Sequence, residues 1–514
     1  MLLHQVLENS AQRYPDKQAV WYRDQWLTYA EIDRRANQIG NYLKQAGIER
    51  SDRVILLYEN SFEYIASYYG ILKAGAVTVP LDTDTTTDAL IYYLNNSGAR
   101  AAITQQKFSR NLAPAIKKAS DLKLVIADQD DLTEYQEIGH CHQIRLQDVY
   151  EQMPHQPPGV RCIDLDLASI VFTSGSTGKP KGATLSHLNF ISNITSIVEY
   201  LQLTADDRIM VVLPFYYIYG QSLLNTHFLV GGSVVLDNRF AFPQVILETM
   251  KKTQVTGFSG VPSTFMILLN KSAVRNFKFE SLRYVTQAGG AMAPAVQKEV
   301  AQVFAPARLF IMYGATEAAA RLSYVAPEML PQKWGSIGKA ISNADLFVAD
   351  ESGKALAPHQ IGEIVARGSN IMSGYWNDPD GTAKVLKNGL YYTGDLGKMD
   401  EDGYLYVVGR SRDIIKVGGF RVAAKEVEEA LLEIDQIHEV AVIGVADPIL
   451  GEAIKAFIVP RDHNSISEDA IRKQLKDKLP THKFPKFYEF PESLPKNESG
   501  KILKEVLKKR ENSR

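Results

Sequence analysis

Cysteine is scarce in this sequence, which has two in 514 residues, Cys141 and Cys162. Two cysteines cannot form the disulfide framework of a secreted protein, so they favour a reducing compartment. An excess of one charge is also missing, because 57 Lys and Arg stand against 59 Asp and Glu, a formal net charge of −2. Without a basic field, a protein dedicated to nucleic-acid binding is not expected.

Long apolar runs are missing as well. The most apolar stretch, residues 209–219, is interrupted by Pro214 and is well short of the roughly 18 residues that a spanning helix needs. Residues 1–5 turn polar too early for a signal peptide. We therefore expect a cytoplasmic protein with no integral membrane segment.

An alternation of strand and helix patterns fills the first part of the chain. Residues 54–57 form a short apolar run typical of a buried strand, residues 62–75 have helical spacing, and residues 76–79 predict another strand. The same alternation returns over residues 168–311. Strands separated by helices predict parallel βαβ units, and so an α/β fold.

The pattern changes near the C-terminus. Residues 391–408 are rich in Gly and Asp turns between short strands, and about 100 residues of α+β character follow. We predict an N-terminal domain over residues 1–409, a polar hinge at 410–413 and a C-terminal domain over 414–514.

One segment has the composition of a phosphate-binding loop. Its glycines let the backbone approach an anion, its amides and hydroxyls donate hydrogen bonds, and its lysines add charge. The spacing G-x-x-G-K differs from the P-loop of nucleotide hydrolases, and Pro180 replaces the magnesium-binding hydroxyl. A flexible Gly/Ser turn is the alternative interpretation. The segment reads Thr173, Ser174, Gly175, Ser176, Thr177, Gly178, Lys179, Pro180, Lys181, Gly182.

Four further motifs follow in order. Taken singly each is weak, since Thr-Glu often starts a helix, T-G-D is usually a turn, and a lysine near a C-terminus is usually solvated. The motifs are Tyr313-Gly314-Ala315-Thr316-Glu317, Tyr392-Thr393-Gly394-Asp395, residues 409–422, and Pro495-Lys496-Asn497-Glu498-Ser499-Gly500-Lys501.

Together, in this order and spacing, the five motifs resemble the AMP-forming, adenylate-forming superfamily of acyl- and aryl-CoA synthetases, nonribosomal adenylation domains and firefly-type luciferases. The resemblance covers about residues 10–505. It implies a large N-terminal lobe of parallel and mixed sheets flanked by helices, with a β-barrel-like part, and a small mobile α+β C-terminal domain. Members of this superfamily convert a carboxylate and ATP into an acyl-adenylate and pyrophosphate, and a thiol then takes the acyl group. The site must therefore neutralise negative charge and hold the attack geometry.

The resemblance also assigns the groups that bind ATP and Mg²⁺. Residues 173–181 are expected to hold the β- and γ-phosphates, Thr316 the α-phosphate, and Glu317 the Mg²⁺ ion, a hard cation that prefers carboxylate oxygen. Asp395 is expected to accept hydrogen bonds from the ribose hydroxyls, helped by Arg410. Adenine is expected between Tyr313 and the stretch Gly289, Gly290, Ala291.

The C-terminal domain is expected to alternate between two positions. In one, Lys501 bridges the substrate carboxylate and the α-phosphate as a catalytic residue, and its compact charge on a flexible stem suits this entry and exit. In the other, a thiol passes a tunnel beside Lys416, Gly418 and Gly419, where glycine permits close approach to the backbone. The hinge position falls on Arg412.

The predicted acyl pocket departs from two relatives of the superfamily. Tyr217 stands where coumarate-type ligases often have a His, and it does not ionise near neutrality. Ile218 stands where amino-acid-activating members have an Asp, so α-amino acids are disfavoured. Arg321 is the one charged residue, and it either binds a second carboxylate or polar group or, as we expect, points to solvent or to a phosphopantetheine arm. The remaining pocket residues are Tyr219, Ser222, Ser259, Ala288, Gly290, Met312 and Ala320.

We therefore predict a free-standing AMP-forming ligase that loads an aliphatic or aryl acid onto CoA. One alternative is an adenylation enzyme that loads an acid or amino acid onto the phosphopantetheine of a carrier protein in trans. Another is a catalytically silent nucleotide-binding protein on the same fold, which the joint presence of Lys501, Glu317 and Asp395 disfavours.

Overall fold

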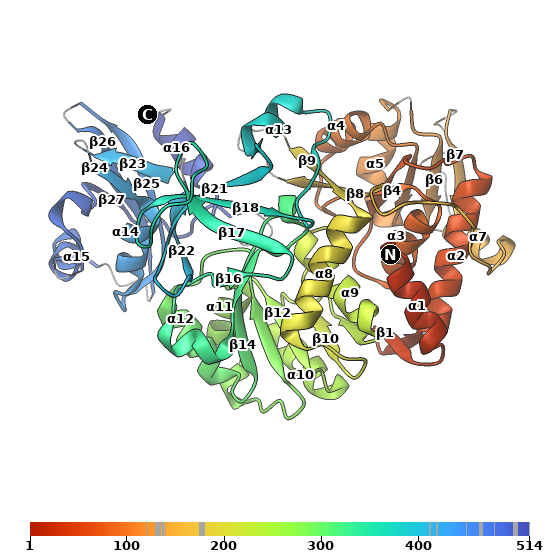
Figure 1. Ribbon diagram of the computed structural model, residues 1–514, viewed down its shortest axis with the longest axis horizontal. Coiled ribbons are helices and arrows are strands. Elements are labelled where there is room, and N and C mark those ends of the chain that lie inside the picture. The colour runs from red at the N-terminus through yellow and green to blue at the C-terminus, as the bar shows by residue number, and fades with distance from the viewer. Residues whose placement is uncertain are drawn as a thin grey trace.

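The chain is described here by a computed structural model. It covers residues 1–119, 121–128, 135, 138, 140–173, 180–410, 413–417, 420–448, 450–461, 466–476, 478–496 and 502–512. In these residues the strands form four sheets (Figure 1).

The first sheet has eight strands in the order β19-β9-β8-β4-β3-β5-β6-β7. Its central strands pair in parallel and are buried along their length, which accounts for their near-continuous apolar sequences. Strand β9 turns back antiparallel to β8. The strands are β3 Arg53–Leu57, β4 Val77–Pro80, β5 Ala101–Thr104, β6 Leu124–Ala127, β7 His142–Arg145, β8 Leu167–Thr173, β9 Lys181–Ser186 and β19 Gly374–Tyr375.

The second sheet has nine strands in the order β16-β15-β14-β13-β12-β10-β11-β1-β2. From β14 to β1 the neighbouring strands are parallel, so their carboxyl ends share one edge. The strands are β1 Gln18–Tyr22, β2 Gln25–Thr28, β10 Arg208–Val211, β11 Ser233–Leu236, β12 Gly257–Gly260, β13 Tyr284–Gln287, β14 Arg308–Tyr313, β15 Ser323–Val325 and β16 Lys339–Ala340.

Helices fill the space between these two sheets. One core cluster joins side chains of both sheets with those of α2 (Tyr29–Gln45), α3 (Phe62–Lys73), α8 (His187–Leu201) and α9 (Ile218–Val230). Helices α3 and α9 are buried on nearly all sides, as their mostly uncharged sequences require. Helix α8 starts at a capping box on Ser186, and it lies near the centre of the molecule in Figure 1.

The third sheet is antiparallel, in the order β17-β18-β21-β20 with β22 paired to β21. Register shifts interrupt the pairing of β21 with both β18 and β22, which is how a sheet bends toward a partial barrel. The strands are β17 Ala344–Ala349, β18 Gly362–Gly368, β20 Leu386–Lys387, β21 Leu390–Met399 and β22 Leu405–Arg410.

The fourth sheet belongs to the C-terminal segment, which lies at one end of the long axis in Figure 1. Helices α14 and α15 pack on it around a core of its own. Lys425 of α14 donates to the carbonyl of Val407 on β22 at 2.7 Å, a contact between this segment and the third sheet. The elements are β23 Ile414–Val417, β24 Phe420–Ala423, α14 Ala424–Leu432, β25 Ile437–Asp447, β26 Gly451–Pro460, α15 Glu468–Leu475, β27 Phe487–Glu489 and α16 Lys504–Asn512.

The other helices lie around these sheets. They are α1 Gln5–Arg13, α4 Thr87–Ser97, α5 Ser109–Ile116, α7 Leu146–Gln152, α10 Pro243–Thr253, α11 Pro262–Lys271, α12 Pro294–Val303 and α13 Pro379–Val385. Short 3₁₀ turns cover η1 Gln106–Phe108, η2 Val274–Asn276, η3 Thr316–Ala318, η4 Pro327–Gln332 and η6 Thr481–Lys483.

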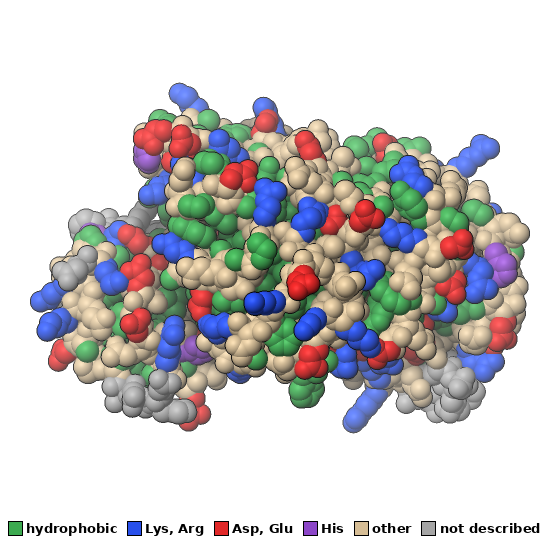
Figure 2. Space-filling model, turned by 90° about the horizontal axis from the view of Figure 1, so that it is seen from below, with side chains coloured by type: hydrophobic (Ala, Val, Ile, Leu, Met, Phe, Trp, Pro, Cys, Tyr) green, Lys and Arg blue, Asp and Glu red, His purple; other side chains and the backbone are tan. Residues whose placement is uncertain are grey.

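The predicted fold class is confirmed. The strands expected at residues 54–57 and 76–79 are β3 and β4, and the helix between them is α3. The division at residues 410–413 stays a prediction. Among the residues described, no helix is long and apolar enough to cross a membrane. On the face drawn in Figure 2, basic and acidic side chains are intermingled, in keeping with the nearly balanced charge.

Candidate active site

The carboxyl edge of the second sheet carries most of the predicted site. Ser259 lies at the end of β12, Ala288 directly follows β13, and Tyr313 ends β14 and leads into Thr316 and Glu317. Helix α9, which begins at Ile218, starts beyond β10 at the same edge. In parallel sheets, ligands bind outside the carboxyl ends of the strands. The fold therefore gathers residues that are far apart in the sequence.

Asp395 is held between two other predicted nucleotide residues. Its carboxylate accepts a hydrogen bond from the Tyr313 hydroxyl at 2.7 Å and forms an ion pair with the Arg410 guanidinium at 2.9 Å. Asp395 and Arg410 face each other as partners on β21 and β22. Residues of three separate motifs thus meet at the buried Asp395 carboxylate. A carboxylate is the kind of acceptor to which ribose hydroxyls donate hydrogen bonds.

Tyr313 and Arg410 keep their protons at neutral pH. Burial, and then the Asp395 carboxylate, raise the pKa of Tyr313 well above its usual value. Burial lowers the pKa of Arg410, but Asp395 first, and then Tyr313, Tyr391 and Asp413, together raise it by more, so its pKa lies above the ordinary value. Tyr313 therefore stays a hydrogen-bond donor and Arg410 a cation.

Glu317 is positioned by the end of the first sheet. The Tyr375 hydroxyl donates to its carboxylate at 2.7 Å, and the Met372 amide donates to its carbonyl at 2.8 Å. Burial and then Glu317 raise the pKa of Tyr375. No group of three or more His, Cys, Asp or Glu residues able to hold a metal occurs among the described residues. One carboxylate fits Mg²⁺ nevertheless, because Mg²⁺ is usually bound through one or two carboxylates, waters and substrate phosphates.

The two ends of the predicted phosphate loop lie on β8 and β9. Thr173 donates to the Lys181 carbonyl at 3.4 Å across this hairpin. The Lys181 ammonium pairs with Asp378 at 2.8 Å and stands 4.9 Å from the centre of the Tyr375 ring. Lys181 and Glu317 therefore share Tyr375 as a neighbour, so the loop and the predicted metal ligand are adjacent.

The turn after Glu317 is tight and strained. A Cβ on Gly314 would lie 1.8 Å from the Ala320 carbonyl oxygen, so only glycine fits there. Ala319 and Ala320 both have positive φ, 51° and 105°, which is rare for residues with a Cβ. Buried Asn193 and Asn370 hold this turn, because each donates to the carbonyls of Ala318 and Arg321.

The stretch predicted to face adenine is open to solvent. Gly289, Gly290 and Ala291 are all exposed, and Gly289 has a φ of 82° that favours glycine. Gln287 at the end of β13 donates to the Gly290 carbonyl at 2.9 Å, which fixes the course of the stretch.

The predicted acyl-pocket residues on β12 and α9 share a hydrogen-bond chain. The Tyr219 hydroxyl lies 2.9 Å from the Thr286 hydroxyl, which lies 2.7 Å from that of Ser259. Ser222 donates to the Tyr219 carbonyl, and Ile218 precedes it on the same helix. Ala288, Met312 and Ala320 are buried. Tyr217 is half-buried and donates to Asp82 at 3.1 Å, so it is more than a packed aromatic ring.

Arg321 departs from expectation. Its residue is only 2% exposed, so the prediction that it points to solvent is wrong. The positive-φ turn at Ala319 and Ala320 directs the chain inward, and the guanidinium lies over the Tyr219 ring, 4.5 Å from its centre. The alternative, a polar contact inside the acyl pocket, stays open.

Several predicted residues lie outside the described part of the chain. Lys416 is on β23, where only its backbone is described. The residues not described are Ser174, Gly175, Ser176, Thr177, Gly178, Lys179, Arg412, Gly418, Gly419 and Lys501.

Models of known families match nearly the whole chain. The model described as AMP-binding enzyme matches residues 7–376, and the model described as AMP-binding enzyme C-terminal domain matches residues 426–501. The chain belongs to the AMP-binding enzyme family. The predicted resemblance to adenylate-forming enzymes is thereby confirmed.

Relatives of this AMP-binding enzyme are CoA ligases by name. It is 34% identical to a feruloyl-CoA synthase of an Amycolatopsis species over 97% of each chain. It is 30% identical to a long-chain-fatty-acid–CoA ligase of Bacillus subtilis, covering 98% of this chain and 94% of the other. The membership and these names show an AMP-forming, acyl-CoA synthetase-like enzyme rather than a silent nucleotide-binding protein.

Solved structures of ligases share the fold. An anthranilate CoA ligase in complex with anthranoyl-AMP superposes with a TM-score of 0.90 at 26% identity, covering 99% of this chain and 97% of that one. ATP-bound MatB from Rhodopseudomonas palustris gives 0.87 at 27% identity over 99% of both chains. An o-succinylbenzoate CoA synthetase of Bacillus subtilis, 27% identical with a TM-score of 0.84 over 99% of both chains, was solved with ATP and magnesium.

Two residues of the site in this AMP-binding enzyme were missed by the sequence motifs. Tyr375 lies in a Gly-Tyr-Trp triplet at the end of β19, and this short aromatic pattern does not indicate which residue it contacts. Tyr200 at the end of α8 donates to the Met312 sulfur at 2.9 Å, and its hydroxyl stands close to Arg321. Nothing local in the sequence signals Tyr200, because its partners lie more than a hundred residues away.

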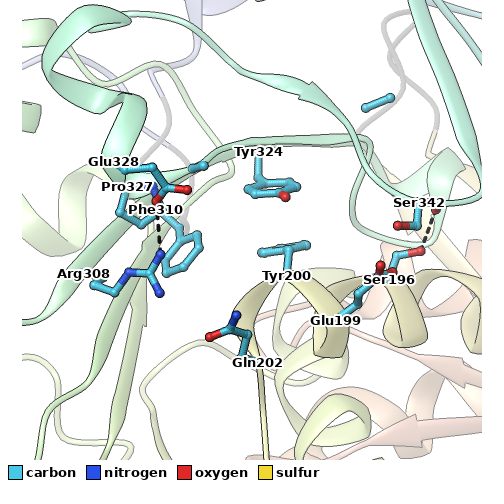
Figure 3. A pocket seen from close by; sticks show the side chains of 12 residues that line it. Ser196, Glu199, Tyr200, Gln202, Arg308, Phe310, Tyr324, Pro327, Glu328 and Ser342 are labelled. Carbon is cyan, nitrogen blue, oxygen red and sulfur yellow. Dashed lines mark hydrogen bonds and ion pairs between the residues drawn. The ribbon is translucent and has the colours of Figure 1, made fainter.

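A separate cavity of about 310 Å³ lies on the outer side of Tyr200. Figure 3 shows Tyr200 stacked on Tyr324, with ring centres 4.1 Å apart, and an Arg308–Glu328 ion pair at the rim. The Tyr200 ring thus lines this cavity while its hydroxyl reaches Met312 of the predicted acyl pocket.

Proposed function

We propose that this protein is an AMP-forming ligase that activates an aliphatic or aryl carboxylic acid with ATP and transfers the acyl group to CoA. The observation that carries the proposal is that Tyr313 and Arg410 both contact the Asp395 carboxylate. This group lies next to the loop that bears Thr316 and Glu317. The names of the relatives support CoA as the acceptor, rather than a carrier protein.

In the first half-reaction, a carboxylate oxygen of the acid attacks the α-phosphorus of ATP, and the bond to pyrophosphate breaks. Asp395 accepts hydrogen bonds from the ribose hydroxyls. Arg410 contacts the same sugar, and Tyr313 lies beside adenine. The loop 173–181 neutralises the β- and γ-phosphates, and Thr316 contacts the α-phosphate. Glu317 would hold Mg²⁺, which supplies charge neutralisation between the phosphates. Lys501 joins the two reacting groups, which otherwise repel each other.

In the second half-reaction, the thiol sulfur of CoA, having lost its proton, attacks the acyl carbonyl, and the bond to AMP breaks. We propose that the C-terminal domain, residues 414–514, turns about Arg412 between the steps. Lys501 then leaves, and the thiol enters beside Gly418 and Gly419. The Lys425–Val407 contact lies next to this hinge.

The test is pyrophosphate release from ATP and Mg²⁺ with fatty, aryl, dicarboxylic and amino acids. Each acid is tried without thiol, with CoA, and with a phosphopantetheinylated carrier protein. Acid-dependent release that CoA stimulates, with an acyl-CoA product in the mass spectrum, is expected. Stimulation by the carrier alone would contradict the assigned acceptor, and release that no acid stimulates would contradict the proposed reaction.

A further inference from the structure

Arg321 is a buried cation without a carboxylate partner among the described residues. Its residue is 2% exposed, and no ion pair within the described ranges involves it. Other half-buried basic residues around the site are paired, Arg410 with Asp395 and Lys181 with Asp378. Arg321 is therefore an exception to the charge pairing of its surroundings.

The contacts of the guanidinium are neutral and few. It lies over the Tyr219 ring, stands close to the Tyr200 hydroxyl, and makes one long hydrogen bond of 3.4 Å to the Ala320 carbonyl. Its Nε is buried and has no hydrogen-bond partner in the described part of the chain. A guanidinium has five N–H donors, so much of its capacity is unused.

Burying such a group is costly. Cation–π contact with a tyrosine recovers only part of the lost hydration, and an unpaired buried charge is among the more destabilising features of a protein interior. Such a group persists where a ligand supplies the missing anion. A planar guanidinium matches a carboxylate in both charge and shape.

The position of Arg321 decides which ligand this is. It stands on the same turn as Thr316 and Glu317, four residues beyond Glu317. The side-chain amides of Asn193 and Asn370 fix that turn by donating to its backbone carbonyls. Its ring neighbour Tyr219 belongs to the predicted acyl pocket, and Tyr200 joins it to Met312. An acid whose carboxylate is activated beside Thr316 would extend its far end among these side chains.

We propose that Arg321 is a specificity-determining residue that binds a second carboxylate on the acid, so that the preferred substrates are dicarboxylic acids. This inference rests on the proposed ligase function. The distal carboxylate pairs with the guanidinium and uses the free Nε–H, while the proximal carboxylate is adenylated. No amino-acid ammonium is required, consistent with Ile218 at the position where amino-acid-activating relatives have an Asp.

The experiment compares a homologous series of aliphatic and aryl dicarboxylic acids, each with its own monomethyl ester. The ester keeps one carboxylate to activate and loses the distal charge. Pyrophosphate release with CoA gives kcat/KM for the wild type, Arg321→Met, Arg321→Lys and, as a matched control on the outer surface, Arg308→Met. AMP binding by calorimetry shows that each variant is folded, because the ribose site does not involve Arg321.

For the best diacid, we expect the wild type to prefer the diacid over its ester by about 100-fold. Arg321→Met should lose that preference and keep or improve its rate on the ester, Arg321→Lys should keep part of it, and Arg308→Met should match the wild type. An equal rate on diacid and ester in the wild type, or a preference that survives Arg321→Met, would overturn the inference and leave the ligase intact. An absence of acid-dependent release with every compound would instead contradict the proposed function, and the inference with it.

Discussion

The nucleotide side and the acyl side of the site differ in how their charges are satisfied. On the nucleotide side, Asp395 has a donor and a cation on it before any ligand binds. On the acyl side, Arg321 is more deeply buried, and its contacts within the described residues are neutral. The difference teaches that the nucleotide side, which every acid uses alike, already contains the positive charge that balances its carboxylate. The part that selects the acid has a charge that the acid itself must balance.

Lys501→Ala should have the largest effect, because it removes the cation that we propose to stand between the two reacting anions. Formation of the acyl-adenylate is expected to fall by about 1,000-fold, the loss typical of a group that stabilises transition-state charge. Transfer from a supplied acyl-adenylate to CoA should be unchanged, since the proposed domain rotation withdraws Lys501 before that step. Single-turnover assays of the two half-reactions measure this.

Gly419→Leu is the matched opposite of that variant, because a side chain in the proposed thiol tunnel should obstruct CoA and spare adenylation. Equal loss of both half-reactions in either variant would point to misfolding rather than to the assigned role. A Lys501→Ala enzyme that adenylates at the normal rate would contradict the assignment of Lys501.

Asp395→Ala tests the nucleotide side of the site. It removes the proposed ribose acceptor and the ion-pair partner of Arg410, so the affinity for ATP should fall by about 100-fold. The loss should be equal for every acid, because Asp395 lies outside the acyl pocket. Calorimetry with ATP and rate ratios between acids check both points, and unchanged ATP affinity would remove Asp395 from the ribose site.

The nucleotide side was the more predictable of the two. Its residues lie in short contiguous motifs, and β-strand pairing brings Asp395 opposite Arg410 with no long-range packing needed beyond the sheet itself. The roles of these residues remain predictions. Strands β3 and β4 were equally predictable from the sequence, since buried parallel strands are apolar along their whole length.

The acyl side was less predictable for a physical reason. The sequence around Arg321 is Ala-Ala-Ala-Arg-Leu, which fixes neither the positive φ of Ala319 and Ala320 nor the side of the turn on which Arg321 falls. Its burial depends on Tyr200 and Tyr219, which come from two different helices. Side-chain burial at a strained turn is a tertiary property that local patterns do not encode.

Tyr375→Phe tests the predicted metal ligand Glu317, which lies between the nucleotide side and the acyl side. It removes the hydrogen bond to Glu317, so the Mg²⁺ concentration for half-maximal rate should rise about tenfold, as for other partners of metal ligands. The control is Tyr58→Phe, which loses a similar phenol–carboxylate bond to Asp128 away from the site. An unchanged Mg²⁺ requirement in Tyr375→Phe would show that Glu317 does not hold the metal.

Asn370→Ala should have the smallest effect on turnover. It removes one of the two amide donors from the Ala318 and Arg321 carbonyls, while Asn193 keeps the other. We expect a loss of about 1–3 kcal/mol in the free energy of unfolding. Urea denaturation measures it. A modest, few-fold loss in the preference for diacid over ester should accompany it, and a stable variant with full discrimination would show that the turn needs no such clamp.

The most direct test of the central claim is the phosphorus balance of the wild-type reaction. The enzyme is incubated with ATP, Mg²⁺, CoA and an accepted acid, and phosphorus NMR follows the products alongside acyl-CoA. The account predicts AMP and pyrophosphate in equal amounts, each matching the acyl-CoA formed. Production of ADP and inorganic phosphate, or acyl-CoA without AMP, would contradict it.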